Sequence, residues 1–191
     1  MDTEKTPGES SGKVPGRPAA GPPGEGSREF HRGDIQGVVV RELGVHRDRR
    51  GWLAETYRLD TLPGGITPVM SYVSFTEPLT ARGPHEHREQ TDLFAFTGPG
   101  TFLLMLWDNR EHSPTRGAVM ELQAGEERPL LVAVPPGVVH GYRNLSREVK
   151  GMVLNFPDRL YRGWGKGEDV DEVRHEDSRD RFYRDFVRGW K

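Results

Sequence analysis

The chain has 191 residues, 27 of them basic and 29 acidic, so its net charge of −2 provides no overall cationic field to attract nucleic acid or an anionic membrane. It contains no cysteine, which excludes disulfides, thiolate metal ligands and thiol nucleophiles. No apolar run approaches the roughly 20 residues of a membrane span, and the N-terminus lacks a secretory signal, so we expect a cytoplasmic protein.

Residues 1–28 are dominated by Pro, Gly, Ser and charged residues, and Val14 is their single large aliphatic side chain. Such a segment buries too little apolar surface to offset the entropy of ordering it, so we predict a disordered tail. The rest of the chain is long enough for one folded domain, which we place at residues 29–178.

From Ile35 onward the chain consists of short runs rich in β-branched and aromatic residues, separated by turns that contain Gly, Pro and Asp. The predicted strands are IQGVVVREL, WLAETYRL, PVMSYVSF, TDLFAF, TFLLMLWD, LLVAV and GMVLNF. This spacing indicates an all-β fold, an antiparallel sandwich or barrel of which the jelly roll is the enclosing form. Near the C-terminus, Phe182, Phe186, Val187 and Trp190 recur every three to four residues, which predicts a short helix over 179–191 that packs on the domain.

Three histidines are the main candidates for chemistry. His85 and His87 in ARGPHEHREQTD would share one face of a strand, and His140 follows a Pro-Pro-Gly turn. Both segments resemble the two halves of the cupin signature, which implies a cupin jelly roll, although the glutamate of that signature falls on Thr91 or Asp92 here. Three imidazoles could bind a divalent metal ion, with Asp92 or Glu89 as a further ligand; they could instead transfer protons, or only fill a polar cavity.

Four motifs in the same order resemble the dTDP-4-dehydrorhamnose 3,5-epimerase family, from about Gly37 to Asp177. GVHRDRRGWLAETY is similar to the family's Asp-x-Arg-Gly-x-x-x-Glu stretch, ARGPH to its Arg-Gly-x-His, WDNREHSPTRG to its Asp-x-Arg-x-x-Ser-Pro-Thr-x-Gly, and VPPGVVHGY to its Ile-Pro-x-Gly-x-x-His-Gly-Phe. The resemblance implies an isomerase that removes a proton next to the ketone of a nucleotide-diphosphate 4-keto sugar, without a cofactor. It also implies a homodimer.

The resemblance assigns the role of base to His85, and we also predict His87 and His140 as catalytic residues. Arg82 and His140 would support the enolate, and arginines such as Arg50 would bind the diphosphate. The predicted substrate-binding residues are Arg50, Glu55, Arg82, Asp108, Arg110 and Tyr142.

The chain departs from the family where the epimerases have a proton-donating tyrosine, because that position is Val153. Tyr142 and Tyr161 are candidate substitutes. The family's enolate-supporting lysine falls on Thr91, and its late aspartate, the partner of the basic histidine, falls beyond the point where this chain enters its own C-terminal helix. The doubled histidine resembles the nucleotide-sugar 3,4-ketoisomerases. Two other functions stay open: a metal-dependent dioxygenase or lyase using His85, His87 and His140, and a sugar-binding cupin without activity.

Overall fold

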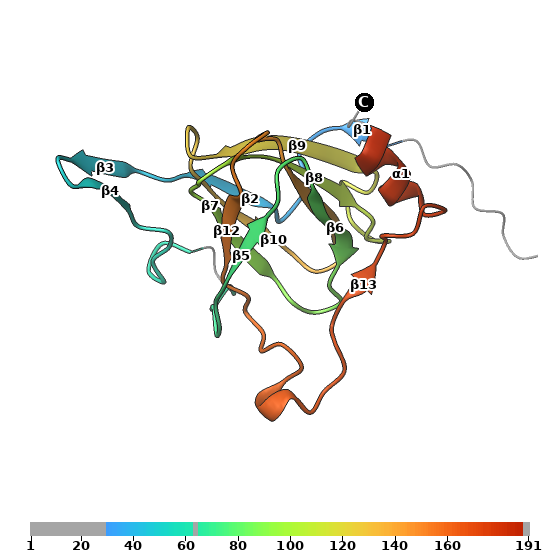
Figure 1. Ribbon diagram of the computed structural model, residues 1–191. Coiled ribbons are helices and arrows are strands. Elements are labelled where there is room, and N and C mark those ends of the chain that lie inside the picture. Colours follow the sequence, from blue (N-terminus) through green and yellow to red (C-terminus); the bar gives the residue numbers. More distant parts are fainter. Residues whose placement is uncertain (1–29, 63–64, 189–191) are drawn as a thin grey trace, which may run out of the picture.

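Two β-sheets lie face to face in the structure, a computed structural model that describes residues 30–62 and 65–188 (Figure 1). The predicted tail over 1–28 lies outside the described residues. The six-stranded sheet runs, in spatial order, β1 (His31–Arg32), β9 (Ala118–Gly125), β8 (Thr101–Asp108), β11 (Val138–Asn144), β6 (Ala81–Glu86) and β13 (Val173–Arg174). The five-stranded sheet runs β2 (Val39–Glu42), β10 (Leu130–Val134), β7 (Asp92–Phe96), β12 (Gly151–Asn155) and β5 (Tyr72–Thr76).

The space between the sheets holds the main hydrophobic core, because alternate side chains on each strand point inward. Phe94 and Phe96 of β7 pack there, while Leu93 and Ala95 of the same strand pack into a second cluster on the outer face. All five residues of β7 are buried for this reason. Burying one such Phe or Leu side chain contributes about 1.5–3 kcal/mol, so this core fixes how the two sheets are placed.

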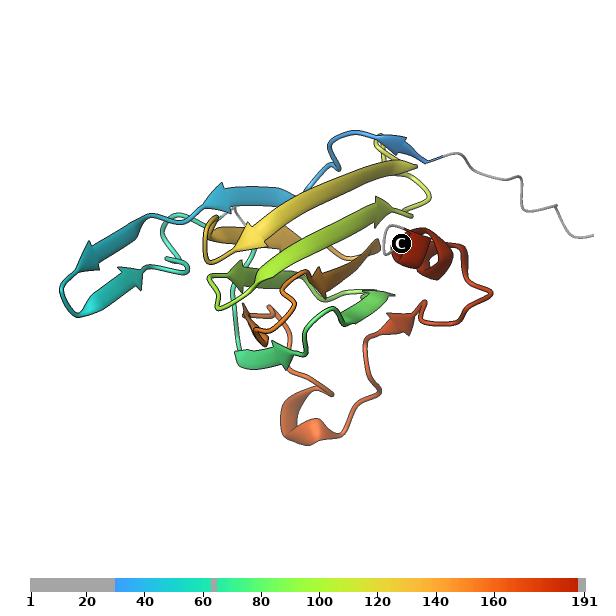
Figure 2. The same ribbon diagram turned by 45° about the horizontal axis from the view of Figure 1, so that its top comes forward.

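The outer face of the six-stranded sheet is covered by helix α1 (Arg181–Arg188), which Figure 2 shows at one end of that sheet. Phe182 and Phe186 of the helix pack against Met105, Trp107 and Val139 in one buried cluster. The helical spacing of the two phenylalanines, four residues apart, places both on one face. The predicted C-terminal helix is therefore present and begins at Arg181 rather than at 179; residues 189–191, including Trp190, lie outside the described residues.

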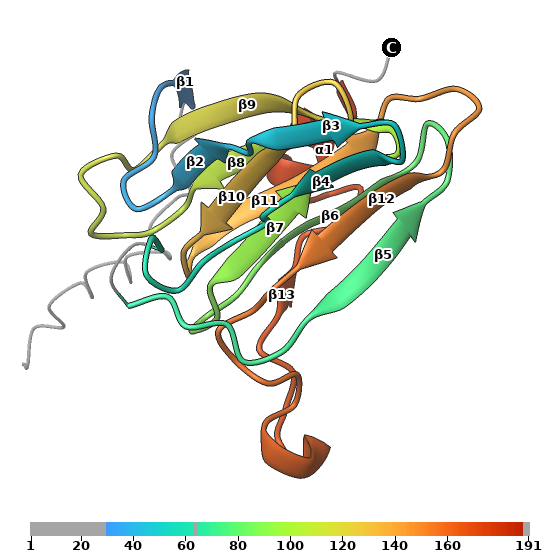
Figure 3. The same cartoon turned by 90° about the vertical axis from the view of Figure 1, so that its left-hand side faces the viewer.

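A two-stranded hairpin, β3 (Val45–Asp48) and β4 (Gly51–Ala54), projects from the body of the molecule (Figure 1). At the opposite side of the five-stranded sheet, β5 is the edge strand, as seen in Figure 3. After β12, residues 156–172 form an irregular segment, with the short 3-10 helix η1 (Trp164–Lys166), before the chain pairs with β6 through β13. We call residues 156–172 the arch.

The jelly-roll prediction is confirmed, with two corrections. The sheets do not close into a hydrogen-bonded barrel. Strand boundaries also differ from the prediction. The predicted strand over 35–43 is strand only at β2, the one over 52–59 only up to Ala54 in β4, and the one over 68–75 only from Tyr72 onward in β5. β9 and β11 were not among the predicted strands. Within the described residues, no helix is long and apolar enough to cross a membrane.

Candidate active site

Strands β6 and β11 approach each other closely at Gly83, and this brings two of the histidines together. Gly83 has φ +81°, and a Cβ atom there would lie 2.8 Å from the carbonyl oxygen of His140. A side chain is therefore excluded at this position both by conformation and by space. The register pairs His140 with His85, and the centroids of their two rings are 4.5 Å apart.

The three imidazoles gather around one carboxylate. One ligand-type atom from each of His85, His87, His140 and Asp92 lies within 4.8 Å of the others. The side chain of Glu86, the last residue of β6, lies between His85 and His87 in the sequence but faces away from them and pairs with His175 at 3.2 Å. This alternation is the strand pattern on which the clustering was predicted.

Asp92, the first residue of β7, is 1% exposed and accepts four hydrogen bonds. Its Oδ2 lies 3.1 Å from Nε2 of His140 and 3.2 Å from Nε2 of His87. Its Oδ1 accepts from the side-chain amides of Gln90 and Asn155, both at 2.8 Å. Burial alone would raise the pKa of Asp92, but the hydrogen bonds from the two histidines hold it well below the usual value. Asp92 is therefore a buried anion.

His87 is held from both sides. Its Nδ1 donates to the backbone carbonyl of Asp171 in the arch, and its Nε2 faces Asp92. Burial lowers the pKa of His87, but Asp92 and Asp171 outweigh burial and raise it to about 9. The carboxylate of Asp171 in turn accepts the backbone N–H groups of Arg88, Glu89 and Gln90 at 2.9–3.0 Å. At neutral pH, His87 is an imidazolium fixed by the arch.

His85 differs from the other two rings because, within the described residues, its side chain makes no hydrogen bond. Both ring nitrogens of His140, in contrast, face oxygen atoms, those of Val138 and Asp92. The nearest acid to His85 is Glu172, with 3.9 Å between Nδ1 and Oε1. Burial, and next the charge of His140, lower the pKa of His85 well below its usual value. His85 is thus an uncharged imidazole with a nitrogen lone pair available.

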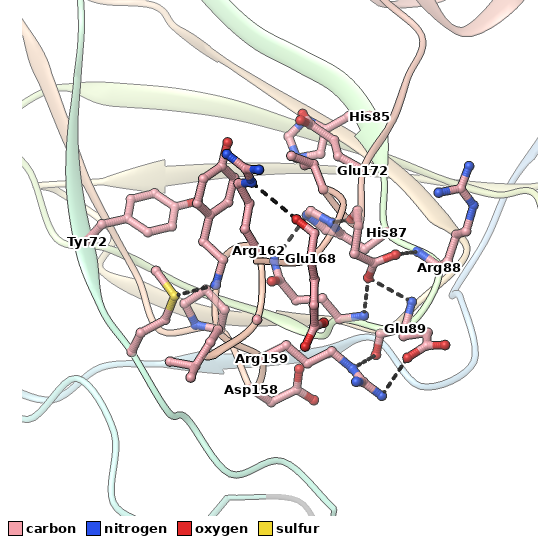
Figure 4. A pocket seen from close by; sticks show the side chains of 18 of the residues that line it. Tyr72, His85, His87, Arg88, Glu89, Asp158, Arg159, Arg162, Glu168 and Glu172 are labelled. Atoms are coloured by element: carbon pink, nitrogen blue, oxygen red, sulfur yellow. Dashed lines mark hydrogen bonds and ion pairs between the residues drawn. The ribbon is translucent and has the colours of Figure 1, made fainter. Parts of the chain in front are cut away.

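A cavity of about 1300 Å³ opens beside this cluster, between the two sheets and the arch (Figure 4). Its walls include His85, His87, Arg82 and Tyr142 among the predicted site residues. Arg82 is anchored on β5, since its Nε donates to Thr76 Oγ1 at 3.1 Å and its Nη2 to the carbonyl of Phe75 at 2.8 Å. The cavity is large enough for a ligand of nucleotide-sugar size.

Four other predicted binding residues lie outside this cavity. Arg50 is in the β3–β4 turn, where it pairs with Asp48, and Glu55 follows β4. Asp108 and Arg110 form an ion pair of 2.9 Å, and Asp108 also accepts from the hydroxyls of Ser113 and Thr115. Burial would raise the pKa of Asp108, but these bonds lower it to about 2. The second pair therefore stabilises the turn after β8.

Several polar residues of the site were not predicted from the sequence. Asp171 and Glu172 reach the histidines because β13 pairs with β6, with Arg174 opposite His85. Tyr72 lines the cavity from β5, and its hydroxyl accepts from Asn155 Nδ2 at 2.8 Å. No local motif marks these residues, and only the period-two alternation of YVSFT, which turns Tyr72, Ser74 and Thr76 to one face, gave a signal.

The same residues fit a divalent metal ion in one respect. Backbone carbonyls fix Nδ1 of both His87 and His140, so their Nε2 atoms converge on Asp92. This outer arrangement is common behind metal-binding histidines. A bound metal ion would act there as a Lewis acid toward a ketone oxygen.

Comparisons with known proteins identify the family of the chain. The family model for dTDP-4-dehydrorhamnose 3,5-epimerase matches residues 32–161. The chain is 36% identical to the probable low-salt glycan biosynthesis epimerase Agl13 of Haloferax volcanii, over 74% of this chain and 87% of that protein. It is also 36% identical to the spore coat polysaccharide biosynthesis protein SpsL of Bacillus subtilis, over 66% and 82%.

The solved structure of a dTDP sugar isomerase from Desulfovibrio desulfuricans has the same fold, with a TM-score of 0.66, 24% identity, and coverage of 78% of this chain and 88% of that one. The four motifs, the jelly roll and these likenesses agree, and the chain belongs to the dTDP-4-dehydrorhamnose 3,5-epimerase family of sugar-nucleotide isomerases.

Proposed function

We propose that the protein removes a proton next to the ketone of a nucleotide-diphosphate 4-keto sugar, with His85 as the base. The observation that carries the proposal is the contrast among the three rings. His87 and His140 are fixed by acceptors at both nitrogens, whereas the ring of His85 is uncharged and open to the cavity. An uncharged imidazole can accept a proton, and a charged one cannot.

The enolate formed in this step needs positive charge nearby, and Arg82 supplies it. Two of its guanidinium nitrogens are engaged on β5, and Nη1 has no partner among the described residues. His140, which the sequence also suggested for this role, has both nitrogens engaged by Val138 and Asp92. We therefore assign the enolate oxygen to Arg82, with His140 and His87 as residues that position His85.

Deuterium exchange tests the reaction. In D2O, the wild-type protein should incorporate deuterium into a dTDP-4-keto sugar at a carbon next to the ketone, and His85→Asn should abolish the incorporation. The control is His112→Asn, which changes an exposed histidine in the turn after β8 and should exchange like the wild type. No exchange by the wild type would contradict the proposal and favour a sugar-binding protein without activity.

A metal-dependent cupin, of the dioxygenase or lyase type, is the second candidate. The convergence of Nε2 of His87 and His140 on Asp92, with His85 adjacent, is the observation that favours it. Stoichiometric iron, nickel or zinc in the purified protein, lost in the His85→Ala/His87→Ala double variant, would support a metal function. The proposed proton transfer itself requires no cofactor.

We further propose a homodimer. Val73 and Phe75 are exposed on the edge strand β5, and Trp52 and Leu53 are exposed on the projecting hairpin. Unpaired sheet edges and apolar patches are usually covered by a partner. Arg50 is remote from the cavity of its own chain, and its side chain, paired with Asp48, is 82% exposed, so in a dimer it would be placed to reach the diphosphate in the partner's cavity. Sedimentation should give twice the 21.6 kDa of one chain, and a monomer mass would contradict this proposal. A cytoplasmic location stays a prediction.

A further inference from the structure

An epimerase needs a proton donor on the face of the sugar opposite its base, and the family's tyrosine is absent at Val153. The missing phenol has a counterpart on the neighbouring strand. β5 pairs with β12 so that Ser74 is opposite Val153 and Tyr72 is opposite Asn155. The phenol of Tyr72 therefore enters the cavity from the five-stranded sheet. It lies on the strand next to Val153, two residues before the residue that is opposite Val153.

Tyr72 and His85 stand on opposite walls. His85 belongs to β6 in the six-stranded sheet and Tyr72 to β5 in the five-stranded sheet, and both line the cavity. Figure 4 shows the ring of Tyr72 directed into the cavity from the side opposite His85 and His87. A sugar ring held between these walls would present one face to each residue.

The hydrogen bonds orient the phenol as a donor. Asn155 Oδ1 accepts the backbone N–H of Leu93 at 3.0 Å, which fixes its amide group so that Nδ2 points to the other side. Nδ2 donates to both Asp92 Oδ1 and the hydroxyl oxygen of Tyr72, at 2.8 Å each. The Tyr72 oxygen thus acts as an acceptor, and its own proton has no acceptor among the described residues. Burial, and next the charge of Asp92, raise the pKa of Tyr72, so the phenol keeps this proton until it is used.

The other tyrosines of the cavity are placed less well. The hydroxyl of Tyr142 lies 3.0 Å from Ser74 Oγ, and its ring, 4% exposed, packs among Phe94, Phe96 and Phe102. Tyr161 is in the arch and 54% exposed. Tyr72 is 45% exposed, and it lines the cavity with its ring.

We propose that Tyr72 is the catalytic acid on the face opposite His85, a role that rests on the proposed function. His85 takes the proton from the carbon next to the ketone, and the electron pair moves into the carbonyl to form the enolate. When the enolate collapses, the same carbon takes the proton of the Tyr72 hydroxyl from the other face, which inverts its configuration. The phenolate, stabilised by Asn155 Nδ2, then regains a proton from water, and the His85 imidazolium loses one to water.

Tyr72→Phe in D2O tests this step, because it removes one oxygen atom and leaves the base. The variant should still incorporate deuterium into the unchanged dTDP-4-keto sugar, since His85 returns a deuteron to the face from which it took the proton. Inverted product should fall by about 100- to 10,000-fold, the usual contribution of a general acid. The control for a Tyr-to-Phe change is Tyr57→Phe, outside the cavity, which should keep both rates.

Three results would overturn the assignment. Tyr72→Phe could form the inverted sugar at the wild-type rate. It could instead lose deuterium exchange and formation of the inverted sugar in equal proportion, as expected of a residue that only supports substrate binding. Tyr142→Phe could instead show exchange without inversion, which would make Tyr142 the acid. A wild-type protein that exchanges nothing would remove the proposed function itself, so the two failures are distinguishable.

Discussion

Replacing Asp92 by Asn removes the buried negative charge of the site and changes almost nothing in volume. The new side chain has only one oxygen, so it can accept hydrogen bonds on one side only. If the oxygen faces His87 and His140, the amides of Gln90 and Asn155 lose their acceptor. If it faces those amides, an N–H group points at the two imidazoles instead. Removing one partner of a buried ion pair costs about 3–5 kcal/mol. We expect the free energy of unfolding to fall by about this amount at pH 6.

The loss of stability in Asp92→Asn should become smaller as the pH rises. The pKa of His87, about 9 in the folded protein against an ordinary 6.5, corresponds to roughly 3 kcal/mol of stability. Because the folded pKa is the higher one, this contribution is complete below pH 6.5 and is lost as the pH rises through 9. The wild type loses this stabilisation over that range, whereas Asp92→Asn has little of it. The difference in the free energy of unfolding between the two proteins should therefore narrow by roughly 3 kcal/mol between pH 6 and pH 9.5.

Urea unfolding of both proteins, followed by circular dichroism at several pH values, measures this difference. The difference in stability between the two proteins is the informative quantity, because His175 titrates in both. Burial lowers the pKa of His175, but Glu86 and Asp180 outweigh burial and raise it. This titration changes the pH dependence of the free energy of unfolding equally in both proteins. A deficit that stays constant from pH 6 to pH 9.5 would refute the ion pair between Asp92 and a protonated His87. A variant as stable as the wild type would refute the buried anion itself.

Three further outcomes follow from the structure. Gly83→Ala should abolish deuterium exchange, because its Cβ atom would lie 2.8 Å from the carbonyl of His140; exchange at the wild-type rate would show that β6 can move away. Phe186→Ala should lower the free energy of unfolding by about 3–5 kcal/mol, since this ring is 1% exposed, and a loss below about 1 kcal/mol in urea unfolding would contradict the packing of α1. The kcat/KM for the 4-keto sugar should stay level from pH 8 to below pH 6.5, because burial and the charge of His140 lower the pKa of His85 and keep it unprotonated; a decline centred above pH 6.5 would mean that the base is not His85.

Strands with continuous apolar runs were predicted over their full length, whereas strands of mixed composition were predicted only in part or were missed. TFLLMLWD and LLVAV became β8 and β10 over the predicted residues, because both faces of these strands pack in the core. AVMELQAG alternates Glu121 and Gln123 with apolar residues, the pattern of a strand with one exposed face, and was missed as β9. WLAETYRL contains strand-forming residues beyond Ala54 that find no partner strand.

The histidine cluster could be predicted because strand alternation and a family motif both point to it. Glu172 and Tyr72 could not, because their places depend on the pairing of β13 with β6 and of β5 with β12, which no local pattern specifies. The sequence offered Asp92 and Glu89 as the acid beside the histidines. Burial distinguishes them in the structure, because Asp92 is buried next to the three rings. Glu89 instead pairs with Arg159, and both side chains are more than half exposed.

Asp171 holds His87 with its backbone carbonyl and residues 88–90 with its carboxylate, although it lies more than eighty residues further along the chain. Both sheets, apart from the two residues of β13, are already complete in sequence at Asn155. During synthesis the N-terminal part is released first, so a scaffold with its core can form while the proposed centre for proton transfer still lacks Asp171. The backbone carbonyl that holds His87 is therefore added only after the core that carries His85, His87 and His140 has been synthesised.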